Sequence, residues 1–258
     1  KTLNDKELTY ITQEKQLGTG HAVAQVIPHL TPSNNSKTII LAGDCPLITK
    51  KTIQDLITHH TKNDIAATIL TTHMKNPTGY GRLIRNSKGN VESIKEHKDC
   101  NEKEKNITEI NSGVYIFDTN LLCKFINKIS TNNAQAEYYL TDIIEILKKE
   151  NYKVDAKCIE NSNEVIGINT RLDLATTNSI KYLENANTHM ENGVTIVDPK
   201  STFIDSDVSI KEDTIIYPFC IIKQKSKIGK NCIINSFNNI NNQTIKDNQI
   251  IEAGNYKN

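Results

Sequence analysis

Isoleucine recurs at every sixth position near the end of this 258-residue chain. The series comprises Ile204, Ile210, Ile216, Ile222, Ile228, Ile234 and Ile240. Two positions before each stands a residue that is mostly small or β-branched: Thr202, Val208, Thr214, Cys220, Ser226, Cys232 and Asn238. This period fits neither an α-helix nor simple strand alternation, but it is typical of hexapeptide β-helices, in which each repeat forms one side of a coil. Seven members in phase argue against the alternative, an ordinary isoleucine-rich sheet. After Ile240 the phase slips to Ile245 and Ile251.

Strand and helix patterns alternate in the part of the chain before about residue 169. An apolar run at 39–42 ends in Gly-Asp, as a buried parallel strand would, and an amphipathic helix follows at 49–60, with Thr49 as its N-cap. Further patterns predict a strand at 64–74, a strand that runs into a helix at 113–126, and a helix at 136–151. Alternating strands and helices predict an α/β fold with a mostly parallel sheet covered on both faces.

Composition excludes several classes of function. The 31 basic and 30 acidic residues give a net charge of +1, so no field favours nucleic acid or a membrane surface. No apolar run approaches the about 20 residues of a membrane span, and the first ten residues lack an apolar signal core, so we expect a cytoplasmic protein. The cysteines are scattered without a C-x-x-C pair, which favours reduced thiols over zinc or disulfides. They are Cys45, Cys100, Cys123, Cys158, Cys220 and Cys232.

The stretch 16–25, QLGTGHAVAQ, looks like a phosphate-binding glycine loop. A Walker loop would need a Lys and a Ser or Thr that are absent, and a dinucleotide fingerprint would need a third glycine where Val23 stands. The loop can still offer backbone N–H groups at a helix N-terminus. The residues alone leave two interpretations open, a ligand loop of another kind and the plain start of a helix.

Seven segments in order carry a family resemblance: QEKQLGTGHAVAQ (13–25), LAGDCPLIT (41–49), NPTGYGRLIR (76–85), IKEHKD (94–99), EINSGVYIF (109–117), NNAQAEYYLTDII (132–144) and EVIGINTRLDL (164–174). Together they resemble bacterial N-acetylglucosamine-1-phosphate uridylyltransferases, whose bifunctional chains continue into a hexapeptide β-helix acetyltransferase. The resemblance implies that UTP and N-acetylglucosamine 1-phosphate react, with Mg²⁺, to give pyrophosphate and UDP-N-acetylglucosamine for peptidoglycan of the cell wall. It also implies a homotrimer formed through the β-helix.

The resemblance divides the chain into three parts. Residues 1–170 would form a Rossmann-like nucleotidyltransferase domain that is incomplete at its N-terminus. Residues 171–192 would form a linker helix, and residues 193–258 would begin a left-handed β-helix that is incomplete at its C-terminus.

Asp44 follows the buried strand at the edge where open α/β sheets bind ligands, and a carboxylate there suits Mg²⁺. The alternative is that Asp44 caps the turn before Pro46. By resemblance, Asn169 supplies a second metal contact and touches the nucleotide. Asn169 or Thr170 could equally cap the helix that follows, with Asp173 completing the pattern.

By resemblance, Gln13, Gly18 and Thr19 bind the uridine, so the glycine loop would hold a base rather than phosphates. An amide side chain and backbone groups can read both donor and acceptor on the uracil edge. Ala42 and Gly43 would line the same pocket through their backbone.

Gly81, Glu96 and Asn111 match the positions that hold N-acetylglucosamine. Without the resemblance, a turn glycine, a surface carboxylate and a strand-edge amide would be the preferred interpretations. Nearby, we interpret Arg82 and Arg85 as solvated strand residues and His97 as a supporting or surface imidazole.

The 258 residues contain no segment of the form L-A-A-G-x-G-T-R-M followed by a lysine, which in this family holds the triphosphate, nor the strand that precedes it. Losing one group that stabilises developing charge costs about 10²–10³ in rate, so we expect impaired turnover from this polypeptide. No histidine follows His189, so acetyl transfer is not expected. The alternatives are a related sugar-1-phosphate nucleotidyltransferase and a non-catalytic fragment that binds sugar nucleotides and trimerises.

Overall fold

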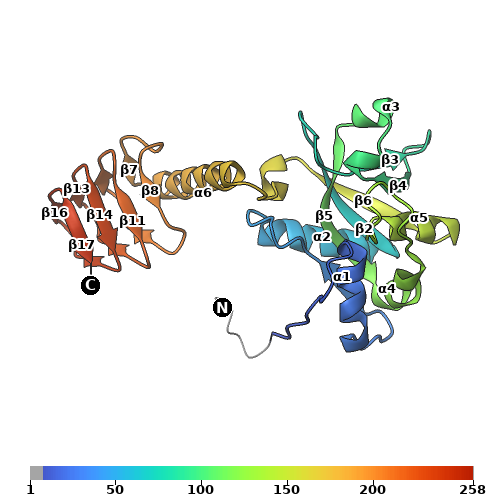
Figure 1. Ribbon diagram of the computed structural model, residues 1–258. Helices are drawn as coiled ribbons and strands as arrows, with labels where there is room; N and C mark the ends of the chain where they lie inside the picture. The colour runs from blue at the N-terminus through green and yellow to red at the C-terminus, as the bar shows by residue number, and fades with distance from the viewer. Residues whose placement is uncertain (1–7, 258) are drawn as a thin grey trace. The chain divides into compact units, whose positions relative to one another are not determined.

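The structure is a computed structural model and describes residues 8–257. The chain forms two compact units, of which the first ends at Val165 and the second begins at Ile166 (Figure 1). None of the helices in the described residues is long and apolar enough to cross a membrane.

The first unit is built on a six-stranded sheet with the order β4-β3-β5-β2-β6, and β1 pairs with β5. Its strands are β1 (Lys37–Ile40), β2 (Ala67–His73), β3 (Arg82–Arg85), β4 (Val91–Lys95), β5 (Glu109–Asp118) and β6 (Val154–Ile159). The predicted α/β class is confirmed, but the sheet is mixed rather than mostly parallel. Strands β2 and β6 are parallel, whereas β5 runs antiparallel to β1, β2 and β3. The β3–β4 pair is also antiparallel, because a short turn joins the two strands as a hairpin.

Strand β5 changes partner along one of its edges. Ile110 pairs with Arg82 of β3, whereas residues 115–118 pair with β1. Between these two pairings lies Gly113, whose φ of 77° suits a glycine, and the register with β2 shifts at the same level. Strands β1 and β3 therefore pair with different parts of the same edge of β5. We call the place where they part the fork, and the candidate site lies there.

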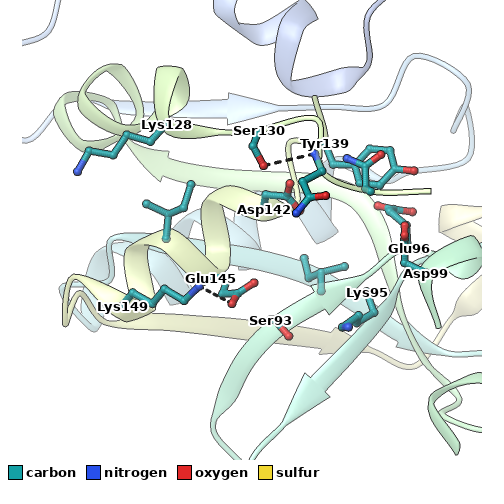
Figure 2. Close-up of a pocket in the computed structure, with 14 residues that line it drawn as sticks. Ser93, Lys95, Glu96, Asp99, Lys128, Ser130, Tyr139, Asp142, Glu145 and Lys149 are labelled. Carbon is teal, nitrogen blue, oxygen red and sulfur yellow. Dashed lines mark hydrogen bonds and ion pairs between the residues drawn. The ribbon is translucent and has the colours of Figure 1, made fainter. Parts of the chain in front are cut away.

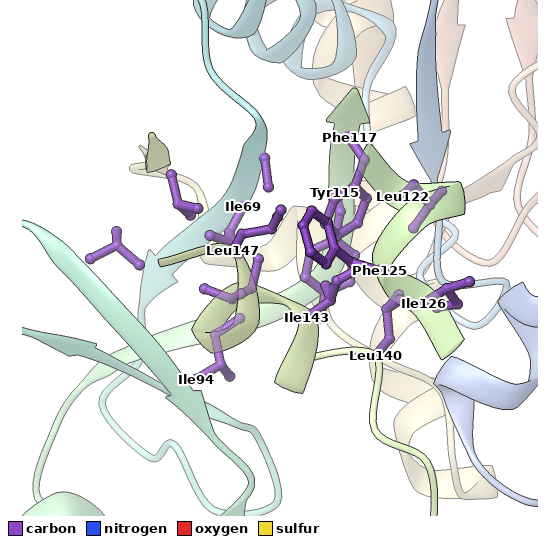
Figure 3. Close-up of a cluster of buried hydrophobic side chains, with 14 of the residues drawn as sticks. Ile69, Ile94, Tyr115, Phe117, Leu122, Phe125, Ile126, Leu140, Ile143 and Leu147 are labelled. Atoms are coloured by element: carbon purple, nitrogen blue, oxygen red, sulfur yellow. The ribbon is translucent and has the colours of Figure 1, made fainter. Parts of the chain in front are cut away.

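Apolar residues cover both faces of the sheet. On one face, Ile69 and Phe117 pack with Ile143 and Leu147 of α5 (Asp142–Lys149) and with residues of α4 (Thr119–Phe125) (Figure 3). On the other face, Leu70 packs with Leu56 of α2 (Lys50–Lys62). Ile69 and Leu70 are neighbours in β2, so strand alternation sends them to opposite faces. Both faces are thus covered, as predicted.

The helices of the first unit begin and end close to the predicted places, with one exception. The N-cap at Thr49 is confirmed, since its hydroxyl accepts a hydrogen bond from the Thr52 amide at 3.1 Å. The helix predicted at 136–151 begins only at Asp142, because the backbone of Tyr138 bonds to the glycine loop instead. The other helical segments are α1 (Thr19–Val26), α3 (Glu102–Lys105) and the 3-10 turns Ile27–His29, His97–Asp99, Ile126–Lys128 and Ser162–Val165.

The second unit consists of α6 (Arg171–Glu191) and a β-helix. Short parallel strands stack in three sheets, so the predicted β-helix is confirmed. Ile222 pairs with Ile204 below and Ile240 above, each 18 residues away, which is three repeats per coil. Its strands are β7 (Thr195–Ile196), β8 (Phe203–Ile204), β9 (Ser209–Ile210), β10 (Ile215–Ile216), β11 (Ile221–Lys223), β12 (Lys227–Ile228), β13 (Ile233–Ile234), β14 (Asn238–Asn241), β15 (Thr244–Ile245), β16 (Ile250–Ile251) and β17 (Gly254–Lys257).

The small residues of the repeat also lie inside the coil. Thr214 and Cys232 are fully buried, and the Thr214 hydroxyl both donates to the Gly229 carbonyl at 2.8 Å and accepts from the Cys232 amide at 3.1 Å. A short polar side chain can therefore satisfy backbone groups at the corner of the coil, where a large one would not fit. The phase slip is a shortened coil, since Ile228 pairs with Ile245 across 17 residues.

His60 of α2 gives the first unit a testable pH dependence. Its ring is 1% exposed, with Nδ1 2.9 Å from the Thr68 hydroxyl, and burial, with a smaller contribution from Lys37, lowers its pKa to about 4. The unfolded chain binds a proton to this histidine below its ordinary pKa of about 6.5 and the folded chain does not, so stability falls as the pH drops from there towards 4. At about pH 5 the loss amounts to about 2 kcal/mol. Urea unfolding of His60→Gln should show a flatter pH dependence, whereas the exposed His29→Gln should follow the wild type.

Candidate active site

A cavity of about 390 Å³ lies at the fork between β1 and β3. Four residues predicted from distant motifs line it: Thr19, Ala42, Glu96 and Asn111. They come from the start of α1, the segment just after β1, the residue just after β4 and the first half of β5. Val23, Ile40 and Leu41 contribute apolar wall. The cavity therefore combines a largely apolar surface with a few polar groups, which is typical of small-molecule sites.

The glycine loop is held in place by the chain around Tyr138. Gly18 has a φ of +107°, and a Cβ there would lie 2.6 Å from the Tyr138 carbonyl oxygen. The Gly20 amide donates to that same oxygen at 2.7 Å, and the Thr19 hydroxyl accepts from the Leu140 amide at 3.0 Å. The loop is thus the start of a helix whose glycines permit a close backbone approach.

Gln13 is fixed beside this loop. Its Nε2 donates to the Gly18 carbonyl at 3.2 Å and lies 2.9 Å from Nδ1 of His21. These contacts orient the amide before any ligand arrives. The structure therefore brings Gln13, Gly18 and Thr19 together, as their proposed shared role requires.

Gly81, Glu96 and Asn111 also converge. The Gly81 carbonyl accepts from the Asn111 amide at 2.9 Å, and a Cβ on Gly81 would lie 3.4 Å from both carboxylate oxygens of Glu96. The Thr141 hydroxyl donates to Glu96 at 3.2 Å, and burial raises the pKa of this carboxyl group. Asn111 donates from Nδ2 to the Tyr115 hydroxyl at 2.7 Å. The three residues together form one polar wall with fixed donors and acceptors.

Asp44 and Gly43 follow Ala42 at the end of β1, and both are exposed. The Cys45 thiol points to Oδ1 of Asp44 at 3.8 Å, and burial, reinforced by Asp44, raises the pKa of the thiol to about 11, so it stays neutral. Within residues 8–257 no group of three or more His, Cys, Asp or Glu side chains is poised to hold a metal. An exposed carboxylate still fits Mg²⁺, which takes one or two protein oxygens and completes its shell with phosphate and water.

Asn169 lies at the start of the second unit. Its amide donates to Asp173 at 3.1 Å, and Thr170 and Asp173 form the capping box that starts α6. The capping interpretation is therefore observed for Thr170 and Asp173. The meeting of Asn169 with Asp44 around a metal stays a prediction.

Sequence reasoning was wrong about Arg82 and missed part of the cavity wall. Arg82 is 1% exposed rather than solvated, and Arg85 forms a two-pronged ion pair with Glu109 at 2.7 and 2.8 Å. Gly113, which lines the cavity, interrupts a strand pattern in EINSGVY, and a glycine in that setting signals a bulge. Thr141 carried no such signal, because its contact with Glu96 spans 45 residues.

A second cavity of about 460 Å³ lies on β4 and α5 (Figure 2). Glu96 lines both cavities, and here it is accompanied by Asp99, Asp142 and the Glu145–Lys149 ion pair of 2.7 Å. Burial, followed by the charges of Glu145 and Asp99, raises the pKa of Asp142 to about 6. This cavity was not predicted from the sequence.

The structure thus combines an α/β unit, which holds a cavity where its strands end, with a β-helix, as the motifs predicted. Residues 2–179 match the family model described as nucleotidyl transferase, and the chain belongs to that family.

Curated relatives agree with this family. The "Bifunctional protein GlmU" of Geobacillus thermodenitrificans is 48% identical over 233 residues, which are 90% of this chain and 50% of the relative. Proteins of the same name from Clostridium novyi and Acetivibrio thermocellus are 45% and 47% identical over 98% and 95% of this chain. The chain spans about half the length of the curated relatives that it matches. The resemblance inferred from the sequence motifs is confirmed.

Proposed function

We propose that this chain forms the uridine- and sugar-binding region of an enzyme that joins UTP to N-acetylglucosamine 1-phosphate. The products are pyrophosphate and UDP-N-acetylglucosamine, a precursor of the peptidoglycan cell wall. The observation that carries the proposal is the convergence of Thr19, Ala42, Glu96 and Asn111 on one cavity. Membership of the nucleotidyl transferase family supports it, and a cytoplasmic location would follow from such a role.

In this reaction the phosphate oxygen of the sugar attacks the α-phosphorus of UTP, so no protein nucleophile is needed. The protein aligns the reactants and neutralises charge. Gln13 and the loop at Gly18 would hold the uracil, while Glu96 and Asn111 would bind sugar hydroxyls and Gly81 would leave room for the ring. The apolar side chains of α1 and β1 that line the cavity would exclude water.

Asp44 and Asn169 would hold Mg²⁺ through oxygen atoms. When bound, the ion supplies positive charge that offsets the charge of the phosphates. An exposed carboxylate next to the cavity wall is the feature of this chain that suits such an ion, and the backbone of Ala42 and Gly43 would lie beside the nucleotide.

The β-helix would serve assembly. Phe219 and Phe237 stack on its outside with ring centroids 5.2 Å apart, and they are 57% and 69% exposed. An exposed aromatic pair of this kind suits contact with other copies of the chain, so we propose a homotrimer. We keep 1–170, 171–192 and 193–258 as the functional division, with the linker helix packing against the coil through Tyr182 and Phe203, whose ring centroids are 5.2 Å apart.

A second candidate is a fragment that binds sugar nucleotides and trimerises without catalysis. This candidate needs only the cavity and the exposed aromatic pair of Phe219 and Phe237. A related sugar-1-phosphate nucleotidyltransferase is a third candidate, and sugar selectivity separates it from the first.

Calorimetric titration with UDP-N-acetylglucosamine and Mg²⁺ tests the proposal. We expect measurable binding that is at least about tenfold weaker for UDP-glucose, because a missing acetamido group leaves polar groups of the site unpaired. Asp44→Asn should remove the dependence of binding on Mg²⁺, whereas the exposed Asp64→Asn on the loop after α2 should keep it. Pyrophosphate release from UTP by the same preparation should stay near background. Equal binding of the two sugar nucleotides would refute the sugar assignment.

A further inference from the structure

Arg82 is a buried cation without a carboxylate partner. Its side chain is 1% exposed, and the ion pairs among residues 8–257 include Arg85, on the same strand, but not Arg82. Its Nε atom is buried without a hydrogen-bond partner within the described part of the chain. Burying a charge in this way is unfavourable, so the arrangement must contribute something other than stability.

The guanidinium group instead joins two loops. Nη1 donates to the Tyr80 carbonyl, and Nη2 lies 3.3 Å from Nδ1 of His97. Because arginine can only donate hydrogen bonds, the His97 nitrogen must be the acceptor. Tyr80 immediately precedes Gly81, and His97 immediately follows Glu96, so these two bonds bracket two residues of the proposed sugar site.

The two hydrogen bonds of Arg82, which we call the bracket, lie at the end of the hydrogen-bonded pairing between β3 and β4. Arg82 and Lys95 form the last pair between β3 and β4. Gly81 and Glu96 come one step beyond this pair and are close enough that a Cβ on Gly81 would lie 3.4 Å from the carboxylate. The ladder no longer sets the spacing of these two residues, whereas the bonds of Arg82 still connect their neighbours.

We propose that Arg82 is a positioning residue for the amino sugar, which holds Gly81 and Glu96 at the spacing that the sugar ring requires. This inference rests on the proposed function. Arg82 lines neither of the two cavities, so it acts through its neighbours and does not touch the ligand. It differs from Arg85, whose bonds go to Glu109 and the Gly89 carbonyl, away from Gly81 and Glu96.

The test compares two ligands, UDP-N-acetylglucosamine and UDP, in calorimetric titrations of the 258-residue chain. Arg82→Met should weaken binding of the sugar nucleotide by about ten- to hundredfold, because small displacements in a site have effects of this size. It should change UDP affinity by less than about twofold, since the hydrogen bonds of Arg82 go to Tyr80 and His97 and not to the residues proposed to hold the uridine. Arg82→Lys should lie between Met and wild type, because one ammonium group cannot span both acceptors.

Arg85→Lys is the matched control for Arg82→Lys. It makes the same substitution on the same strand, but it leaves the two hydrogen bonds of Arg82 intact. It should leave the preference for the sugar nucleotide over UDP unchanged. His97→Phe keeps a ring but removes the acceptor, so it should reproduce the selective loss, and the Arg82→Met/His97→Phe double variant should lose little more than either single variant.

The outcomes separate this inference from the proposed function. A wild-type chain with no preference for UDP-N-acetylglucosamine over UDP would refute the proposed function itself. A wild-type preference that survives both Arg82→Met and His97→Phe would overturn the positioning role alone. Equal losses for both ligands would also overturn it, because Arg82 would then support the whole unit. If Arg82→Met does not fold, His97→Phe decides by the same criterion.

Discussion

Gly18→Ala is expected to weaken UDP binding by about 100-fold or more and to destabilise the first unit by about 3 kcal/mol. The added Cβ would lie 2.6 Å from the Tyr138 carbonyl oxygen, and the φ of +107° is itself unfavourable for alanine. Either the loop or the chain at Tyr138 must move, and this breaks the 2.7 Å bond from the Gly20 amide. Hydrogen exchange at Gly20 reports this bond directly, while urea unfolding and calorimetry report stability and binding.

Gly89→Ala is the control for this prediction. Its φ is +81°, but a Cβ there would meet no atom within 4 Å, and the residue lies in the β3–β4 hairpin turn away from the cavity. It should cost about 1 kcal/mol for backbone strain and leave UDP binding intact. If Gly18→Ala proved no worse than Gly89→Ala, the close contact with Tyr138 would not matter to the fold.

Ile222→Ala is expected to destabilise the β-helix by about 3 kcal/mol, because it opens a cavity in a packed interior. Ile222 is fully buried between Ile204 and Ile240, and the loss therefore affects three successive coils. In a solenoid each coil is stabilised by its neighbours, so a defect in the middle lowers cooperativity as well as stability. The change should appear as a lower urea midpoint for the transition of the second unit.

Ile221→Ala provides the matched control in the same strand. Ile221 is the preceding residue, points to the opposite side and is 38% exposed. Its truncation should cost no more than about 0.5 kcal/mol in an isolated chain. Similar costs for Ile221 and Ile222 would mean that the hexapeptide isoleucines do not carry the core of this unit.

The proposed ligand groups could be recognised from the sequence only in part. Short motifs that resemble those of a known family predicted Thr19, Ala42, Glu96 and Asn111, and these four residues line one cavity. The environment of Arg82 could not be predicted. An arginine in a four-residue strand is expected to be solvated, and its burial depends on contacts with β4 and the residues after it, which are distant in the sequence. The strand directions were predicted incorrectly for a similar reason, since the alternation of strands and helices does not reveal that β5 inserts antiparallel between β3 and β2.

The β-helix could be predicted from the sequence alone, because in a solenoid each side chain packs against its counterpart one coil away and the period is therefore visible along the chain. Through the family resemblance, it also pointed to the short segments that we propose to bind the ligands. The place where those segments meet became visible only in the folded chain. The fork exists because β5 exchanges β3 for β1 halfway along one edge, and it gathers Thr19, Ala42, Glu96 and Asn111 around one cavity. Such contacts join residues far apart in the chain, and no local pattern encodes them.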